Sequence, residues 1–186
     1  MKALNKALFG GTVALVTLSL SPFAGAGTLK TGSKAPDFKA TGSDGKTYTL
    51  KSFTGKNVPT VLYFIGSSCP VNAEAAKYFN RVAEAYKGQV NFVGVIDSDQ
   101  KKYKVWQSRF KAPYLVLLDP DMKIIKAYKA ERSPWAIMVN GKGEVGKTWT
   151  GYSTKQIEEL GAAIASTRKI AAKKLDVTGA PSSPRT

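Results

Sequence analysis

The sequence predicts an α/β domain whose sheet is covered on both faces. Two near-continuous apolar runs, 58–64 and 90–96, have the length and β-branched composition of strands buried from both sides. Between them, apolar residues recur at helical spacing, at Val71, Ala75, Tyr78, Val82 and Tyr86. This alternation of strand, helix and strand is typical of α/β architecture.

The N-terminal part of the domain predicts a β-hairpin. After a short lead-in over 27–35, the hairpin runs from Phe38 to Thr49 and turns at the Ser-Asp-Gly-Lys sequence of 43–46. The helix after the 58–64 strand begins at Pro70, because proline is favoured at the first helical position. It ends near Tyr86, since the following Gly88 is a typical helix stop.

The second half continues the alternation and closes with a hairpin and a helix. Ser98 or Asp99 caps a helix that carries Tyr103, Trp106 and Phe110. A strand is then expected over 114–118, followed by a turn over 119–121 and a short helical segment over 124–130. The motif Asn140-Gly141-Lys142-Gly143 joins two expected strands, over 135–139 and 144–149, into a hairpin. The last helix begins with the capping box 153–156 and carries an apolar stripe of Ile157, Leu160 and Ile164. The Pro/Ser/Gly-rich chain after about Leu175 is expected to be disordered.

The first 26 residues have the composition of a secretory signal peptide. Lys2 and Lys6 precede a mostly apolar stretch over 7–20, and Pro22 and an Ala-Gly-Ala site over 24–26 follow it. We therefore expect cleavage after Ala26 and a periplasmic or secreted protein, with an uncleaved anchor as the alternative. The resulting organisation is a signal peptide over 1–26, a domain over 27–166, and a basic helix end with a disordered tail over 167–186.

Composition narrows the classes of partner and of chemistry. The net charge of +15 would suit nucleic acid, but no nucleic-acid-binding motif accompanies it and the leader directs the chain outward. Acidic partners, an anionic envelope surface or simple solubility explain the charge better. The chain contains no histidine, which excludes Cys-His hydrolases and histidine-based zinc sites. We expect neither a metal nor a cofactor, and the oligomeric state stays open.

Cys69 is the only cysteine, and it lies between a predicted strand and a predicted helix. With Pro70 at the first helical position, Cys69 is the N-cap residue, and its sulfur is expected to face the N–H groups of Val71 and Asn72. Those donors and the positive end of the helix dipole favour a thiolate. An unpaired cysteine in an exported protein suggests either a reactive thiol or an intermolecular disulfide. An inert, half-buried cysteine remains the alternative.

Several motifs in a fixed order resemble one family. They are Gly32-Ser33-Lys34-Ala35-Pro36-Asp37-Phe38, Asp44-Gly45-Lys46, Gly55-Lys56 before the strand ending Val61-Leu62-Tyr63-Phe64, Cys69-Pro70, Leu118-Asp119-Pro120-Asp121 and Ser133-Pro134. Over roughly residues 30–165 the chain resembles the redoxin branch of the thioredoxin-like fold, which includes the alkyl hydroperoxide reductase/thiol-specific antioxidant (AhpC/TSA) proteins and the TlpA-type thiol oxidoreductases. The resemblance implies three α/β/α layers, a central mixed sheet and an N-terminal β-hairpin.

The resemblance also implies roles for residues around Pro134. Pro134 looks like the family's cis-proline facing the reactive cysteine, and Ser133 would offer its backbone N–H and C=O groups to an extended substrate. Trp135 could wall the thiol pocket or be a core aromatic, and Arg132, next to this loop, is a candidate substrate-binding residue. Asn72 could assist the sulfur through its N–H or its side-chain amide, or could be simply a polar residue in the first helical turn.

Two departures from the family pattern limit the chemistry. Asn72 stands where dithiol members have their second cysteine, so Cys69 cannot form an internal disulfide. The peroxiredoxin motif Pro-x-x-x-Thr-x-x-Cys is absent, because its proline and threonine positions are Leu62 and Gly66. We therefore expect an exported thiol oxidoreductase that acts on a protein or small-molecule thiol, disulfide or peroxide by mixed-disulfide or sulfenic-acid chemistry, with an external resolving thiol. The alternative is a non-catalytic peptide-binding module with a vestigial thiol.

Overall fold

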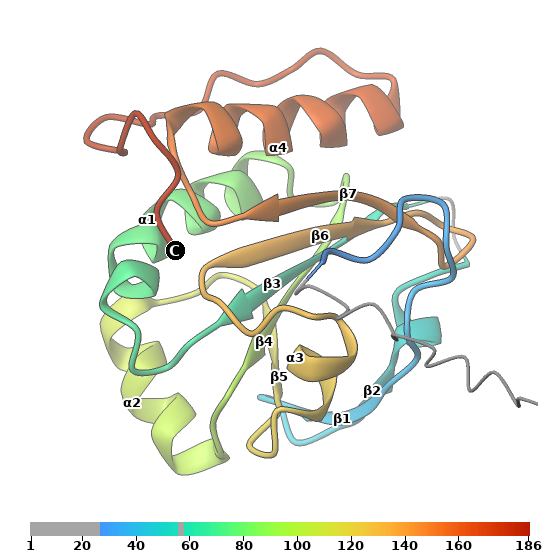
Figure 1. The fold of residues 1–186 in the computed structure, drawn as a ribbon, viewed down its shortest axis with the longest axis vertical. Coiled ribbons are helices and arrows are strands. Elements are labelled where there is room, and N and C mark those ends of the chain that lie inside the picture. The colour runs from blue at the N-terminus through green and yellow to red at the C-terminus, as the bar shows by residue number, and fades with distance from the viewer. Residues whose placement is uncertain (1–26, 56–57) are drawn as a thin grey trace, which may run out of the picture.

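A seven-stranded mixed sheet forms the centre of the protein, whose computed structural model describes residues 27–55 and 58–186 (Figure 1). The strands are β1 (Lys39–Gly42), β2 (Thr47–Thr49), β3 (Thr60–Ile65), β4 (Asn91–Ile96), β5 (Leu115–Leu118), β6 (Trp135–Val139) and β7 (Val145–Thr150). Their order is β2-β1-β5-β4-β3-β6-β7. The central strands β3, β4 and β5 are parallel, while β1, β2, β6 and β7 pair antiparallel with their neighbours.

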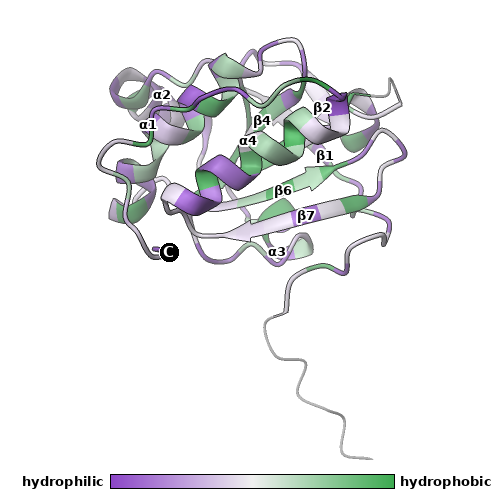
Figure 2. Ribbon diagram, turned by 90° about the horizontal axis from the view of Figure 1, so that it is seen from above, coloured by the Kyte–Doolittle hydropathy of each residue, from purple (hydrophilic) through white to green (hydrophobic). Residues whose placement is uncertain are grey.

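Helices cover both faces of this sheet. On one face lie α1 (Pro70–Ala85), α2 (Gln100–Phe110) and α4 (Thr154–Arg168), and on the other lie the short α3 (Lys123–Ala127) and the N-terminal segment with the 3-10 turn Leu50–Ser52. Figure 2 shows α4 crossing above β6 and β7. The buried strand β3 serves both cores, because Val61, Tyr63 and Ile65 point to one face and Leu62 and Phe64 to the other. The predicted thioredoxin-like three-layer α/β/α architecture with an N-terminal β-hairpin is confirmed.

The helix caps refine the expected boundaries. Asp99, rather than Ser98, caps α2, because its carboxylate accepts a 2.8 Å hydrogen bond from the N–H of Lys102. At α4, the Ser153 hydroxyl accepts from the N–H of Gln156 at 3.2 Å, as a capping box requires. The Gln156 side chain donates instead to the carbonyl of Thr150, at 3.3 Å. The predicted box is therefore only half formed.

The C-terminal segment is ordered, which corrects the expectation of a disordered tail. After α4 the chain turns back along that helix toward α1 (Figure 1). The Tyr78 hydroxyl donates to the carbonyl of Thr178 at 3.1 Å, and Arg185 forms a 2.6 Å ion pair with Glu74. The tail holds only a few apolar residues, but they pack against the core on the α1/α4 face: Leu175, Val177 and Ala180. The Pro/Ser/Gly-rich composition of the segment gives no sign of these few, widely spaced apolar residues, so the sequence did not predict that it packs on the core.

The predicted signal peptide over 1–26 lies outside the described residues. Within the described ranges, none of the helices combines the length and apolar character that crossing a bilayer requires.

Candidate active site

The site begins where β3 ends and α1 starts. The chain leaves the sheet at Gly66, and the Cys69 N–H donates back to the Gly66 carbonyl at 3.1 Å, which closes a tight turn. Cys69 is the N-cap residue of α1, with extended backbone angles (φ −79°, ψ 119°), and Pro70 follows at the first helical position. The side chain of Cys69 is half-buried. The predicted strand–turn–helix junction is therefore confirmed.

The Cys69 sulfur faces a different partner from the one expected. It makes no hydrogen bond to the first-turn N–H groups of Val71 and Asn72. Instead, Sγ lies 3.5 Å from the carbonyl oxygen of Ser133, to which the thiol donates. The predicted partners all lie in α1, whereas the loop before β6 brings a carbonyl acceptor close to the S–H group. The thiol thus bridges two loops that are 64 residues apart in the sequence.

The Ser133 hydroxyl joins these two loops. The Ser133–Pro134 peptide is cis, as the resemblance implied, and Pro134 is buried. The Oγ of Ser133 accepts hydrogen bonds from the N–H of Gly66 at 2.8 Å and from the side-chain amide of Asn72 at 2.6 Å. It also lies 3.4 Å from the carbonyl of Phe64, to which it can donate. One hydroxyl therefore connects the end of β3, the first turn of α1 and the cis-proline loop.

Asn72 is completely buried and forms part of this connection. Its Nδ2 donates to Ser133, and its Oδ1 accepts a 3.1 Å hydrogen bond from the hydroxyl of Tyr63. Burial raises the pKa of Tyr63 well above its ordinary value of 10.0, so this phenol stays protonated and keeps donating. The Asn72 amide therefore contacts Ser133 and forms no hydrogen bond with Cys69, and support of the sulfur by Asn72 stays a prediction.

The other predicted site residues have separate environments. Trp135 is only 6% exposed and packs within the core on the α3 face, which favours a core aromatic over a wall of the thiol pocket. Arg132 is exposed and forms no ion pair among the described residues. Pro70 is exposed beside Cys69, and Val71 is partly buried against the core.

Two contributors were missed in the sequence. Tyr63 supplies a hydroxyl to the buried network, although its position in an apolar strand signals only burial. Asp97 follows β4 and accepts a 2.7 Å hydrogen bond from the N–H of Ser67, so it holds the loop that leads to Cys69. Its position did carry a signal, because polar residues after neighbouring parallel strands meet at the same edge of the sheet.

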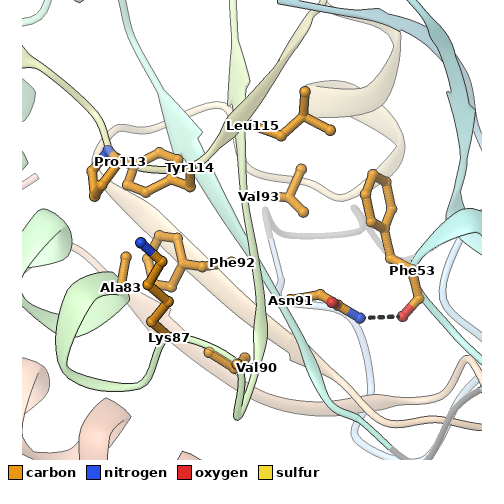
Figure 3. Close-up of a pocket in the computed structure, with 11 residues that line it drawn as sticks. Phe53, Ala83, Lys87, Val90, Asn91, Phe92, Val93, Pro113, Tyr114 and Leu115 are labelled. Atoms are coloured by element: carbon orange, nitrogen blue, oxygen red, sulfur yellow. Dashed lines mark hydrogen bonds between the residues drawn. The ribbon is translucent and has the colours of Figure 1, made fainter. Parts of the chain in front are cut away.

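Two hollows bear on the location of the site. One, of about 320 Å³, lies next to Cys69 and is formed by Ser67, Ser68 and α2. The other, of about 250 Å³, is shown in Figure 3, where Phe92 and Tyr114 lie beside the side chain of Lys87. This second hollow opens at the start of β4, at the opposite end of the parallel strands from Cys69.

No cluster of three metal-binding side chains occurs within 27–55 and 58–186.

Comparison with known families agrees with this geometry. The family model described as "AhpC/TSA family" matches residues 31–148, which is more than half of the chain. The chain belongs to the AhpC/TSA family. Among curated family relatives, the thiol-disulfide oxidoreductase ResA of Bacillus subtilis is 27% identical over 143 residues, covering 76% of this chain and 79% of ResA. Peroxiredoxin Bcp of the same organism is 27% identical over 150 residues, covering 78% and 89%.

Solved structures place this family member in the thioredoxin-like fold. A protein of Chlorobium tepidum, provisionally assigned as the thiol:disulfide interchange protein DsbE, superposes with a TM-score of 0.69 at 23% identity, over 76% of this chain and 99% of that one. A secreted disulfide oxidoreductase of Mycobacterium tuberculosis superposes with a TM-score of 0.59 at 25% identity, over 69% and 95%. The family therefore groups this chain with both disulfide and peroxide enzymes, and the site must distinguish between them.

Proposed function

We propose that this protein is an exported thiol–disulfide oxidoreductase that works through Cys69 alone and relies on an external thiol to complete its cycle. Its family and fold support thiol-dependent chemistry, since its relatives include ResA and other disulfide oxidoreductases. The single cysteine excludes a self-contained dithiol cycle. The composition of residues 1–26 supports export.

The observation that carries the proposal is the position of the Cys69 sulfur against the cis-proline loop. The thiol is half-buried at the N-terminus of α1 and contacts the Ser133 carbonyl. The Ser133 N–H has no hydrogen-bond partner within the described part of the chain. An extended substrate could pair with this N–H by adding a strand-like backbone, which would bring its disulfide to the sulfur. Asn72 and Gly66 hold the loop in place through the Ser133 hydroxyl.

The proposed cycle has two exchange steps. The Cys69 thiol loses its proton to solvent, and the thiolate attacks one sulfur of the substrate disulfide. A Cys69–substrate disulfide forms, while the second substrate sulfur leaves with the electron pair of the broken bond. Asn72 has no thiol with which to resolve this intermediate. The thiolate of an external thiol therefore attacks the substrate sulfur, forms a disulfide with it, and releases Cys69 as a thiolate.

The surroundings of Gly66 favour a disulfide over a peroxide as the substrate. Peroxiredoxins place threonine at this position, but a Cβ atom at residue 66 would lie 3.0 Å from the Cβ of Cys69 and 3.2 Å from that of Ser133. Both separations are tighter than ordinary van der Waals contact. A threonine here would require the Cys69 and Ser133 side chains to shift by a few tenths of an ångström, and Gly66 itself carries no hydroxyl that could orient a peroxide.

A turnover assay with a matched thiol control tests the proposal. The protein is given a peptide disulfide with glutathione as the external thiol, and Cys69→Ser is compared with the double variant Ser68→Cys/Cys69→Ser. That double variant retains one thiol, displaced by one residue onto an exposed position. We expect turnover above the glutathione background from the wild type alone. Equal rates for the wild type and the double variant would refute a built site. Peptide binding by Cys69→Ser without any wild-type turnover would identify a non-catalytic binding module.

A further inference from the structure

The geometry points to a basic stripe on α2 as the docking surface for an acidic segment of the protein that supplies the external thiol or the substrate disulfide. The stripe is formed by Lys102, Val105, Trp106 and Arg109. This inference rests on the proposed function, because it names the chemistry of the partner that reacts with Cys69.

The stripe forms one side of the hollow next to Cys69. Its members are spaced i, i+3, i+4 and i+7, so they lie on one face of α2. Together with Phe110 they line the 320 Å³ hollow, and its other side is Ser67 and Ser68, the two residues that precede Cys69. Val105 is 62% exposed, against 37% for Ile170, the other exposed large apolar side chain of the described residues. An apolar side chain of a partner could cover Val105 within reach of the thiol.

The positive charge of α2 is uncompensated. The helix and its C-cap carry five cations and no acidic residue: Lys101, Lys102, Lys104, Arg109 and Lys111. The nearest acidic residue in sequence, Asp99, is the N-cap and accepts from the Lys102 N–H. None of the five is in an ion pair within the described residues, whereas seven cations elsewhere are: Lys34, Lys46, Arg81, Lys123, Lys147, Lys155 and Arg185. α2 therefore presents unpaired positive charge, and two of its cations, Lys102 and Arg109, line the hollow next to the reactive sulfur.

The spacing of the stripe defines the acidic segment that fits it. Lys102 and Arg109 are seven residues apart, which is about 10 Å along a helix axis. On a helical partner segment, carboxylates seven residues apart lie on one face and span the same length. The fitting partner therefore carries two Asp or Glu residues at that spacing, an apolar side chain between them for Val105, and a cysteine nearby. Such charge complementarity raises association rates by factors of about 10 to 10³ at low salt.

Activated peptides test this docking surface directly. Peptides of equal length, acidic or basic around one cysteine, are joined through that cysteine to thionitrobenzoate. The Cys69 thiolate attacks the peptide sulfur and forms the mixed disulfide. Coloured thionitrobenzoate leaves with the electron pair, and the thiol proton goes to the buffer. Each rate is divided by that with neutral dithiodipyridine, so that changes in intrinsic thiol reactivity cancel.

The charge-reversal variant Lys102→Glu/Arg109→Glu is compared with Lys51→Glu/Lys126→Glu, which makes the same charge change on the opposite face of the sheet. We expect the wild type to favour the acidic peptide by about tenfold or more at low salt. The α2 variant should lose that preference and the control variant should keep it.

Three outcomes would overturn the inference in distinguishable ways. Equal wild-type rates for both peptides would refute docking on α2 while leaving the proposed function intact. Failure of every peptide to react would refute the proposed function, and this inference with it. Binding to phosphatidylglycerol vesicles that the α2 variant loses, with its peptide preference unchanged, would assign the stripe to a lipid surface instead.

Discussion

Replacement of Ser133 by alanine removes the hydroxyl that joins the cis-proline loop to the turn before Cys69. In the structure this oxygen accepts from the Gly66 N–H at 2.8 Å and from the Asn72 amide at 2.6 Å. Alanine leaves both donors without that acceptor in a partly buried site. A buried donor that loses its partner costs about 1–3 kcal/mol.

The two losses are not equal. Gly66 loses the acceptor that its N–H uses, whereas the Asn72 amide keeps a weaker 3.4 Å contact with the carbonyl of Phe64. We therefore expect Ser133→Ala to lower the free energy of unfolding by about 2–4 kcal/mol. Urea unfolding followed by tryptophan fluorescence measures this change, and the slope of the transition should stay as in the wild type.

A double-mutant cycle with Asn72→Ala isolates the hydrogen bond between the two side chains. When the amide is already absent, Ser133→Ala orphans only the Gly66 N–H, so its cost should fall by about 1–2 kcal/mol. A loss below about 1 kcal/mol for Ser133→Ala, or strictly additive effects of the two substitutions, would refute the network.

Three further predictions concern the same site and the tail. Gly66→Ala should destabilise the fold by about 1–3 kcal/mol, seen as a lower Tm, because its Cβ crowds Cys69; an unchanged Tm would contradict the packing. In Asn72→Cys, reaction with dithionitrobenzoate should release two thionitrobenzoates per chain instead of one, because the introduced thiol attacks the Cys69–thionitrobenzoate disulfide. Release of one equivalent would show that the introduced thiol cannot reach Cys69. Hydrogen bonds from Thr178, with Arg81 nearby, hold the pKa of Asp176 below its ordinary 3.8. The stabilisation of the tail by this carboxylate is therefore present above pH 3.8 and lost as pH falls through the lowered pKa. The NMR chemical shifts of the tail residues should change over the same pH range. Chemical shifts that stay constant through that range would contradict this role of Asp176.

Local sequence patterns were sufficient to predict the helices and strands and to place Cys69 at the junction of a strand and a helix. The apolar run before Gly66 and the proline after Cys69 define a strand end and a helix start from neighbouring residues alone. The expected strand over 135–139 matches β6 without a shift. The cis bond at Pro134 followed from the family resemblance and could not have come from spacing.

Contacts between segments that are distant in the sequence could not be predicted from it. The Asn72 amide pairs with Ser133, 61 residues away, and nothing near Asn72 indicates that partner. The direction of the Cys69 sulfur was wrong for the same reason, since its acceptor comes from another loop. The stripe on α2 could have been found, because Lys102, Val105, Trp106 and Arg109 share helical spacing; its proximity to Cys69 required the fold.

The central claim is that the folded site presents Cys69 for exchange, and its most direct test is the rate at which oxidised glutathione forms a mixed disulfide with the chain. Intact mass measures this rate at one pH for the native protein and for the protein unfolded in urea. We expect the native chain to react faster, to stop at one glutathione, and to stay modified until an external thiol is added. A native rate below that of the unfolded chain would contradict the account, because the fold would then shield the thiol rather than present it.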